Sequence, residues 1–121
     1  MYATGNALTT LLPRIGTLAR LERLVLLDNK IAALPPQIGR LTCLLTLHLS
    51  GNRLSTLPAE IGNLKRLDTL TLLRNPIKML PPTLSRLKER TEMTVGYRAM
   101  SFVEQKRLKK QFPHIRIAFG P

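Results

Sequence analysis

The stretch LLTLHLSGNRLSTLPAEIGNL, residues 44–64, decides the fold because the chain repeats its pattern on both sides. A shift of 23 residues toward either end places leucine, isoleucine or methionine on most of its aliphatic positions and asparagine on Asn52. Full copies of the pattern begin at Leu21, Leu44 and Leu67. A period in the low twenties, with aliphatic residues at fixed distances from an asparagine, is typical of repeats that stack on one another to bury their apolar sides.

Each repeat is expected to contain a strand and a return limb. The segment LxxLxL alternates aliphatic and variable residues, as a strand with one buried face does. Strands stacked at this interval would pair in parallel. The return limb LPxxIGxL begins with proline and contains Gly16, Gly39 or Gly62, which favours a short helical turn or a 3-10 piece over a full helix.

An asparagine stands where each repeat leaves its strand. Its side chain offers two donors and an acceptor, which can satisfy backbone groups that a curved loop would otherwise leave unpaired. We therefore expect a structural ladder of Asn6, Asn29, Asn52 and Asn75.

The repeat region is predicted to span residues 1–90, with a partial repeat at 1–20 and full repeats starting at 21, 44 and 67. In the partial repeat the first strand is only a stub, and no polar element stands in front of it. Terminal repeats normally carry a polar outer face, so we expect this end to be covered by upstream sequence or by a second copy of the chain. A homodimer through the first repeat is the corresponding prediction.

Residues 91–121 are predicted to form a cap. A last strand in phase is expected at about 92–96, then a helix that begins with the capping-box pair Ser101 and Glu104 and ends before Pro113. The alternating segment HIRIAF, residues 114–119, predicts a closing strand. One face of the helix is expected to be apolar, formed by Phe102, Val103, Leu108 and Phe112. Its other faces are basic, formed by Lys106, Arg107, Lys109 and Lys110.

These motifs resemble the leucine-rich repeat family, in particular its 23-residue kind with LPxxIGxL in the return limb, seen in Ras-suppressor-like, plant intracellular Ras-group-related and many bacterial proteins. The ending from Ala99 to Phe119 looks like the helix and strand that close many bacterial arrays. The resemblance implies an α/β fold: a right-handed solenoid with a parallel sheet on its concave side and short helical or 3-10 turns on its convex side. It also implies a protein partner, with a small GTPase or a signalling protein among the candidates.

Family members commonly bind through the concave sheet, where the variable strand residues of this chain would be exposed. The residues expected to contact a partner are Tyr2, Arg23, Val25, Leu27, Asp28, Thr46, His48, Ser50, Thr69, Thr71, Leu73, Arg74, Glu92, Thr94 and Tyr97. Val25, Leu27, Leu73 and Tyr97 are expected to be exposed apolar anchors among short hydroxyl side chains, an arrangement that concentrates interface energy. The alternative is that the threonines are present because they favour strands.

The formal charge of +12 opens a second function class. Much of it lies within residues 86–116, so the cap helix is the alternative binding surface, for nucleic acid or an anionic surface. Aromatic residues are not interleaved with these charges, and a basic last turn also complements the helix dipole. Nucleic acid is therefore the less favoured partner.

The sequence offers no catalytic constellation. It contains no phosphate loop, no metal-spaced Cys or His cluster and no nucleophile motif, and no carboxylate or thiol is placed to orient His48. We expect no enzyme activity, cofactor or metal. The single Cys43 cannot form an internal disulfide, and no apolar run reaches the roughly 18 residues of a membrane span. The first residues lack a signal-peptide pattern, which predicts a cytoplasmic protein; secretion by a route without such a signal is the alternative.

Overall fold

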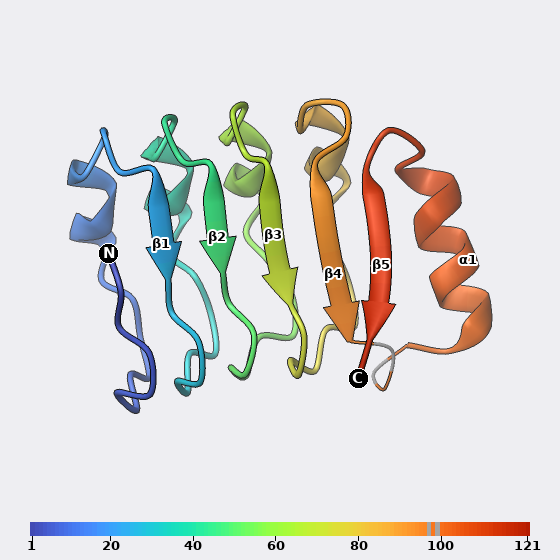
Figure 1. The fold of residues 1–121 in the computed structure, drawn as a ribbon, viewed down its shortest axis with the longest axis horizontal. Coiled ribbons are helices and arrows are strands. Elements are labelled where there is room, and N and C mark those ends of the chain that lie inside the picture. The colour runs from blue at the N-terminus through green and yellow to red at the C-terminus, as the bar shows by residue number, and fades with distance from the viewer. Residues whose placement is uncertain (97, 99) are drawn as a thin grey trace.

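The computed structural model describes residues 1–96, 98 and 100–121. They form a five-stranded parallel sheet in the order β1-β2-β3-β4-β5, so strands that follow one another in sequence are neighbours in space. The strands are β1 (Arg23–Val25), β2 (Thr46–His48), β3 (Thr69–Leu72), β4 (Glu92–Gly96) and β5 (Arg116–Gly120). Figure 1 shows the strands side by side in one layer, with short helices behind them. The predicted stack of parallel strands and short helical turns is confirmed.

The first four strands pair at an offset of one repeat. Leu24 is the partner of Leu47, and Leu47 is the partner of Leu70. The partial repeat adds a stub of strand, since the Val25 N–H donates to the Met1 carbonyl at 2.8 Å. Because the register equals the sequence period, residues at the same repeat position form columns across the sheet.

The core lies between the sheet and the return limbs. Its members are the aliphatic residues that the repeat pattern marks, and strand leucines such as Leu24, Leu47 and Leu70 are fully buried. Burying one such side chain contributes about 1.5–3 kcal/mol, and each repeat provides several. Stacking of repeats is therefore the main source of stability.

Each return limb contains a short 3-10 helix, as expected: η1 (Pro13–Thr17), η2 (Pro36–Arg40), η3 (Ala59–Asn63) and η4 (Pro82–Arg86). The glycines in these helices are required because neighbouring limbs approach closely. A Cβ atom on Gly39 would lie 2.7 Å from the carbonyl oxygen of Glu60, and one on Gly62 would lie 2.4 Å from that of Thr83. At the same position of the last repeat, Ser85 is exposed and its side chain is accommodated.

The cap consists of α1 (Phe102–Gln111) and β5. The predicted capping box is present, since the Ser101 hydroxyl accepts from the Glu104 N–H at 3.2 Å and the Glu104 carboxylate accepts from the Ser101 N–H at 2.9 Å. Leu108 and Phe112 are buried against the last repeat. The closing strand is parallel to β4 and begins at Arg116, two residues later than the sequence indicated.

The predicted apolar face of α1 is wrong for two of its four members. Phe102 is 69% exposed and Val103 is 75% exposed. With 3.6 residues per turn, these positions lie roughly 120° and 140° around the helix from Leu108. Only Leu108 and the following Phe112 therefore face the core.

Candidate functional site on the open face of the sheet

Two columns of side chains cross the open face, which is the side of the sheet opposite the 3-10 helices. The first column is Arg23, Thr46, Thr69, Glu92 and Arg116, and the second is Tyr2, Val25, His48, Thr71, Thr94 and Ala118. The register therefore brings the predicted strand residues together. Arg116 and Ala118 were missed, because the alternation in residues 114–119 indicates a strand but not its pairing partner.

The first column is charged at its ends and neutral in the middle. Arg23 is exposed, while Thr46 and Thr69 are half-buried. At the other end, Glu92 is exposed and its Oε1 lies 4.0 Å from Nη1 of Arg116. The neutral hydroxyl side chains of Thr46 and Thr69 thus lie between Arg23 at one end and the pair of Glu92 and Arg116 at the other.

The second column contains His48, whose Nδ1 lies 3.0 Å from the Thr71 hydroxyl oxygen. Both residues are half-buried, as is Thr94. The expectation that Val25 is an exposed anchor is wrong, because its side chain is only 7% exposed. Its register partners Tyr2 and His48 stand on either side of it and limit its access to solvent.

A hollow of about 360 Å³ lies on this face. Its lining consists of six residues that were all predicted to contact a partner: Tyr2, Arg23, Val25, Thr46, His48 and Thr69. None of the six is acidic, and five of them carry hydrogen-bonding groups around the apolar Val25. The hollow therefore presents hydrogen-bonding groups, together with the positive charge of Arg23, around one apolar side chain.

Three further predicted contact residues, Leu27, Ser50 and Leu73, are less accessible than expected because they pack or bond within the protein. Ser50 is buried, and its hydroxyl accepts a hydrogen bond from the Leu73 N–H at 3.0 Å, so its expected exposure is wrong. Leu27 and Leu73 are half-buried rather than exposed. The Leu73 side chain reaches over β4 to β5, since its Cδ2 lies 2.9 Å from where a Cβ on Gly120 would be. The absence of a side chain at Gly120 makes room for it.

Asp28 and Arg74 lie at the edge of the face, as predicted, but they bind each other. Arg74 Nη2 lies 3.1 Å from Asp28 Oδ1, although the two residues belong to repeats separated by another. Gly51 stands between them, and a Cβ there would lie 2.2 Å from the same carboxylate oxygen. The shared repeat position of residues 28, 51 and 74 is the one sequence signal for this pair. Tyr97, predicted beside them, lies outside the described residues.

The asparagine ladder is formed by three of the four predicted members. The Asn52 amide donates to the carbonyls of Leu26 and Leu49, both at 2.9 Å, and its Oδ1 accepts from the Ile31 N–H at 3.1 Å. Asn29 and Asn75 are buried and bonded in the same way.

The fourth member, Asn6, is exposed. It contributes its backbone N–H, which donates to Asn29 Oδ1 at 3.0 Å. Among the described residues its side chain makes no ladder hydrogen bond, because the ladder amides bond to carbonyls of the preceding repeat. Asn6 lies in the first repeat of the stack.

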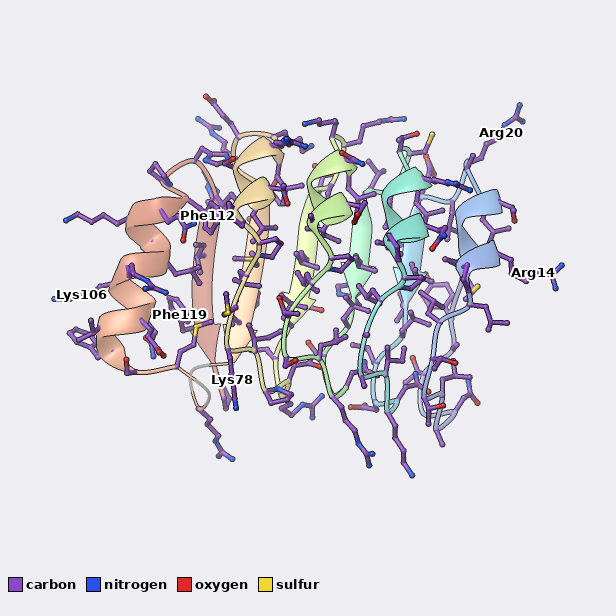
Figure 2. All side chains as sticks on the ribbon, turned by 180° about the vertical axis from the view of Figure 1, so that it is seen from behind. Arg14, Arg20, Lys78, Lys106, Phe112 and Phe119 are labelled. Atoms are coloured by element: carbon purple, nitrogen blue, oxygen red, sulfur yellow. The ribbon has the colours of Figure 1, made fainter. Side chains whose placement is uncertain are left out.

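The basic residues of the cap helix divide into two pairs. Lys106 Nζ lies 4.6 Å from the centre of the Phe102 ring, and Lys109 Nζ lies 5.6 Å from that of Phe119. Figure 2 shows Lys106 pointing away from the stack while Phe112 lies between α1 and the rest of the molecule. Arg107 and Lys110 border a groove between α1 and the coil before η4.

Within the described part of the chain, no group of three or more His, Cys, Asp or Glu residues is arranged to hold a metal ion. The helices described there are all too short or too polar to cross a membrane. Cys43 is half-buried with a free thiol.

Comparisons with family profiles and with solved structures both identify leucine-rich repeat proteins as similar to this chain. A family profile described as "Leucine rich repeat" matches residues 19–77. Among solved structures, a leucine-rich repeat protein of Leptospira interrogans is 37% identical, with a TM-score of 0.62 over 92% of this chain and 22% of that one. A search of curated protein sequences gives no match.

Two structures from Arabidopsis thaliana are also similar. A chain of the complex of BIR3 with SERK2 is 32% identical, with a TM-score of 0.58 over 66% of this chain and 45% of that one. The ectodomain of the receptor kinase GASSHO1/SCHENGEN3, solved with CASPARIAN STRIP INTEGRITY FACTOR 2, is 31% identical, with a TM-score of 0.58 over 84% of this chain and 13% of that one. The chain thus spans less than half the length of each of these three proteins.

Proposed function

Because this chain belongs to the leucine-rich repeat family, we propose that it is a non-enzymatic module that binds a protein partner through the open face of its sheet. The hollow beside His48 carries the proposal. It joins residues of three repeats and the first-repeat stub into one surface, in which hydrogen-bonding groups surround the largely buried Val25. Such a mixture of a small apolar centre and a polar surround is characteristic of protein interfaces.

The similar structures support protein binding in general. One is a complex of BIR3 with SERK2, and another is an ectodomain bound to CASPARIAN STRIP INTEGRITY FACTOR 2. The identity of the partner of this chain does not follow from them, and a small GTPase or a signalling protein stays a candidate from the family resemblance alone.

The non-enzymatic part of the proposal rests on His48. The group placed at hydrogen-bond distance from its Nδ1 is the Thr71 hydroxyl, at 3.0 Å. A catalytic histidine needs a nucleophile and an orienting group in a geometry where a substrate atom can sit between donors. We assign His48 a binding role, as one of the residues that line the hollow.

The test compares two double variants in affinity capture from extract of the source cells, with quantitative mass spectrometry. Tyr2→Ala with Arg23→Glu alters the hollow, and both residues are exposed. Thr56→Ala with Arg53→Glu is the matched control, because it makes the same kinds of change, one truncation to alanine and one charge reversal, at exposed residues of the coil after β2. Loss of a Tyr or Arg anchor costs about 2 kcal/mol or more, so recovery of the partner should fall more than tenfold in the first variant only. Equal recovery with both variants would remove the open face as the binding site.

Binding of nucleic acid or an anionic surface through α1 is the competing function. Two of its basic groups, Lys106 and Lys109, already lie over aromatic rings of the cap, a contact of about 0.5–1 kcal/mol at exposed sites. Titration with a random-sequence DNA duplex at low and physiological salt separates the two functions. Steeply salt-dependent binding that Lys106→Glu with Lys109→Glu abolishes would favour the cap, while no binding at low salt would exclude it.

A further inference from the structure

A second hollow, larger than the one on the open face, lies between α1 and the coil of residues 78–81 with the start of η4. We call it the cap groove; its volume is about 590 Å³. In the view from behind, α1 and the coil that carries Lys78 stand on either side of β5 (Figure 2). This volume lies within the range of about 300–1,000 Å³ that is usual for ligand-binding clefts.

The groove exists because α1 does not pack on the last repeat as another repeat would. In the two repeats before it, the first leucine of the return limb is covered by the next limb, so Leu34 is 6% exposed and Leu57 is 4% exposed. Leu80 occupies the same position in the last repeat, yet it is only half-buried, as Leu11 is in the first repeat, and it lines the groove. Apolar surface that the two preceding repeats cover is therefore open here.

Met79 adds a large apolar side chain beside Leu80. It is 71% exposed and lines the groove. The same position of the other repeats carries Thr10, Ala33 and Thr56, which are small and also exposed. The position therefore does not need an apolar residue for stacking, and the methionine is unexplained by the fold.

The rim of the groove is cationic. Lys78 comes from the coil, and Arg107 and Lys110 come from α1. One carboxylate, that of Glu104, is also present, but it accepts the Ser101 N–H at 2.9 Å as part of the capping box. Three positive groups thus surround an apolar floor that includes Met100 and Leu108.

We propose that the cap groove docks an acidic peptide segment of a partner protein, with one apolar side chain inserted between Met79 and Leu108 and flanking carboxylates bound by Lys78, Arg107 and Lys110. Charge complementarity selects this occupant, because an uncharged apolar segment would leave the three cations desolvated without partners. The surface is separate from the hollow on the open face, since the two share no lining residue.

The first experiment selects displayed random peptides on the intact chain and sorts the binders by dependence on the groove. Met79→Thr restores the residue of the equivalent repeat position, and Arg107→Glu reverses one charge on the rim. Lys106→Glu is the matched control, because it lies on the same helix outside the groove lining. Peptides rich in Asp and Glu around a leucine, phenylalanine or methionine should lose about tenfold in affinity with each groove variant and little with the control.

A second measurement locates the bound peptide with methyl-labelled methionine. The chain has 4 methionines. Met79 and Met100 line the groove, whereas Met93 is buried in the core and Met1 lies in the first repeat. Addition of a selected peptide should shift the methyl resonances of Met79 and Met100 and leave that of Met1 in place.

Several results would overturn the proposal. They are the absence of any groove-dependent peptide, groove-dependent peptides without acidic residues, and shifts at Met1 without shifts at Met79. Phosphatidylserine vesicles provide a further arm: binding to them that Lys106→Glu and Arg107→Glu weaken equally would assign the charges to an anionic surface instead. The open-face variant Tyr2→Ala with Arg23→Glu should leave peptide binding unchanged, so failure of either surface can be told from failure of the other.

Discussion

Asn29, Asn52 and Asn75 join the turns of neighbouring repeats, and each side chain is buried among backbone groups of two repeats. The N–H groups of each amide donate to carbonyls at the ends of two strands, and its oxygen accepts from a backbone N–H in the turn of the preceding repeat. A leucine in any of these positions would bury more apolar area but would leave those backbone groups without partners, which is the larger cost.

Replacement of one ladder amide should therefore be costly only where it is buried. Asn52→Ala leaves the Ile31 N–H and the carbonyls of Leu26 and Leu49 without that partner, and we expect it to lower the free energy of unfolding by about 1–3 kcal/mol. Asn6→Ala is the control at the same repeat position, and because Asn6 is exposed the expected loss is under about 0.5 kcal/mol. Urea denaturation followed by circular dichroism measures both, and equal losses would contradict the ladder.

Gly51 is a second residue whose role depends on other repeats. Its φ is +76°, and a Cβ would also collide with the Asp28 carboxylate that Arg74 binds. Gly5 has a φ of +69° and nothing within 4 Å of its Cβ position. An alanine there would therefore show the cost of the positive φ alone, without a steric clash.

Gly5→Ala and Gly51→Ala should thus differ in their effect on stability. Both alanines adopt a positive φ, which costs about 1 kcal/mol, and only Gly51→Ala also displaces Asp28. The ion pair itself is exposed and contributes at most about 1 kcal/mol, so Asp28→Ala should restore part of the stability of Gly51→Ala. Thermal unfolding of the three variants tests this order, and an identical melting temperature for Gly5→Ala and Gly51→Ala would contradict it.

The 3-10 helices determine how closely elements can stack. Buried glycines let η2 approach η3 and let η3 approach η4, so that the carbonyl oxygen of one limb meets the backbone of the next. The sheet on the other side of the core holds its strands at the fixed spacing of backbone hydrogen bonds. The two layers can pack at one repeat interval only if the helices are narrow enough.

A methyl group between two limbs should therefore disturb the whole stack. Gly39→Ala places Cβ 2.7 Å from the Glu60 carbonyl oxygen, and we expect a loss of about 1–3 kcal/mol from the backbone shift that follows. Ser85→Ala is the control at the equivalent, exposed position and should change stability by less than about 0.5 kcal/mol. Chemical denaturation of the two proteins gives the comparison; a neutral Gly39→Ala would show that the limbs can separate without cost.

At the scale of the whole molecule, the two ends of the stack differ. The cap buries Leu108, Phe112 and Ile115 at one end. At the other, large apolar residues of the first repeat are exposed, including Met1, Leu12 and Leu18. Exposed apolar groups beside a strand that pairs on one side within the described residues favour a covering partner, which is either sequence upstream of residue 1 or a second copy of the chain.

We expect the chain to self-associate through this first repeat. Light scattering should show a mass that rises from monomer toward dimer as concentration increases about a hundredfold, as mass action requires. Leu12→Glu with Leu18→Glu should shift the equilibrium toward monomer, whereas Phe102→Glu with Val103→Glu, which adds the same charges at exposed cap residues, should not. A monomer over the whole range, or equal effects of both variants, would contradict association through this repeat.

Much of the fold could be predicted because it is specified within one repeat. The alternation in LxxLxL places Leu47 and Leu49 in the core, the proline and glycine of the return limb select a 3-10 helix, and Ser101 with Glu104 begins α1. The period then determines parallel pairing and register, and so which strand residues share the open face. That a partner contacts those residues stays a prediction.

The sequence by itself therefore determined the repeat, its strands, its turns and the cap helix, since each depends on residues a few positions apart. Only the tertiary structure decided which side chains are accessible. Val25 and Ser50 are buried by residues of other repeats, Asp28 finds Arg74 across Gly51, and the cap groove depends on where α1 packs. Accessibility depends on the size and position of neighbouring side chains, and those neighbours lie in other repeats or in the cap, far away in sequence.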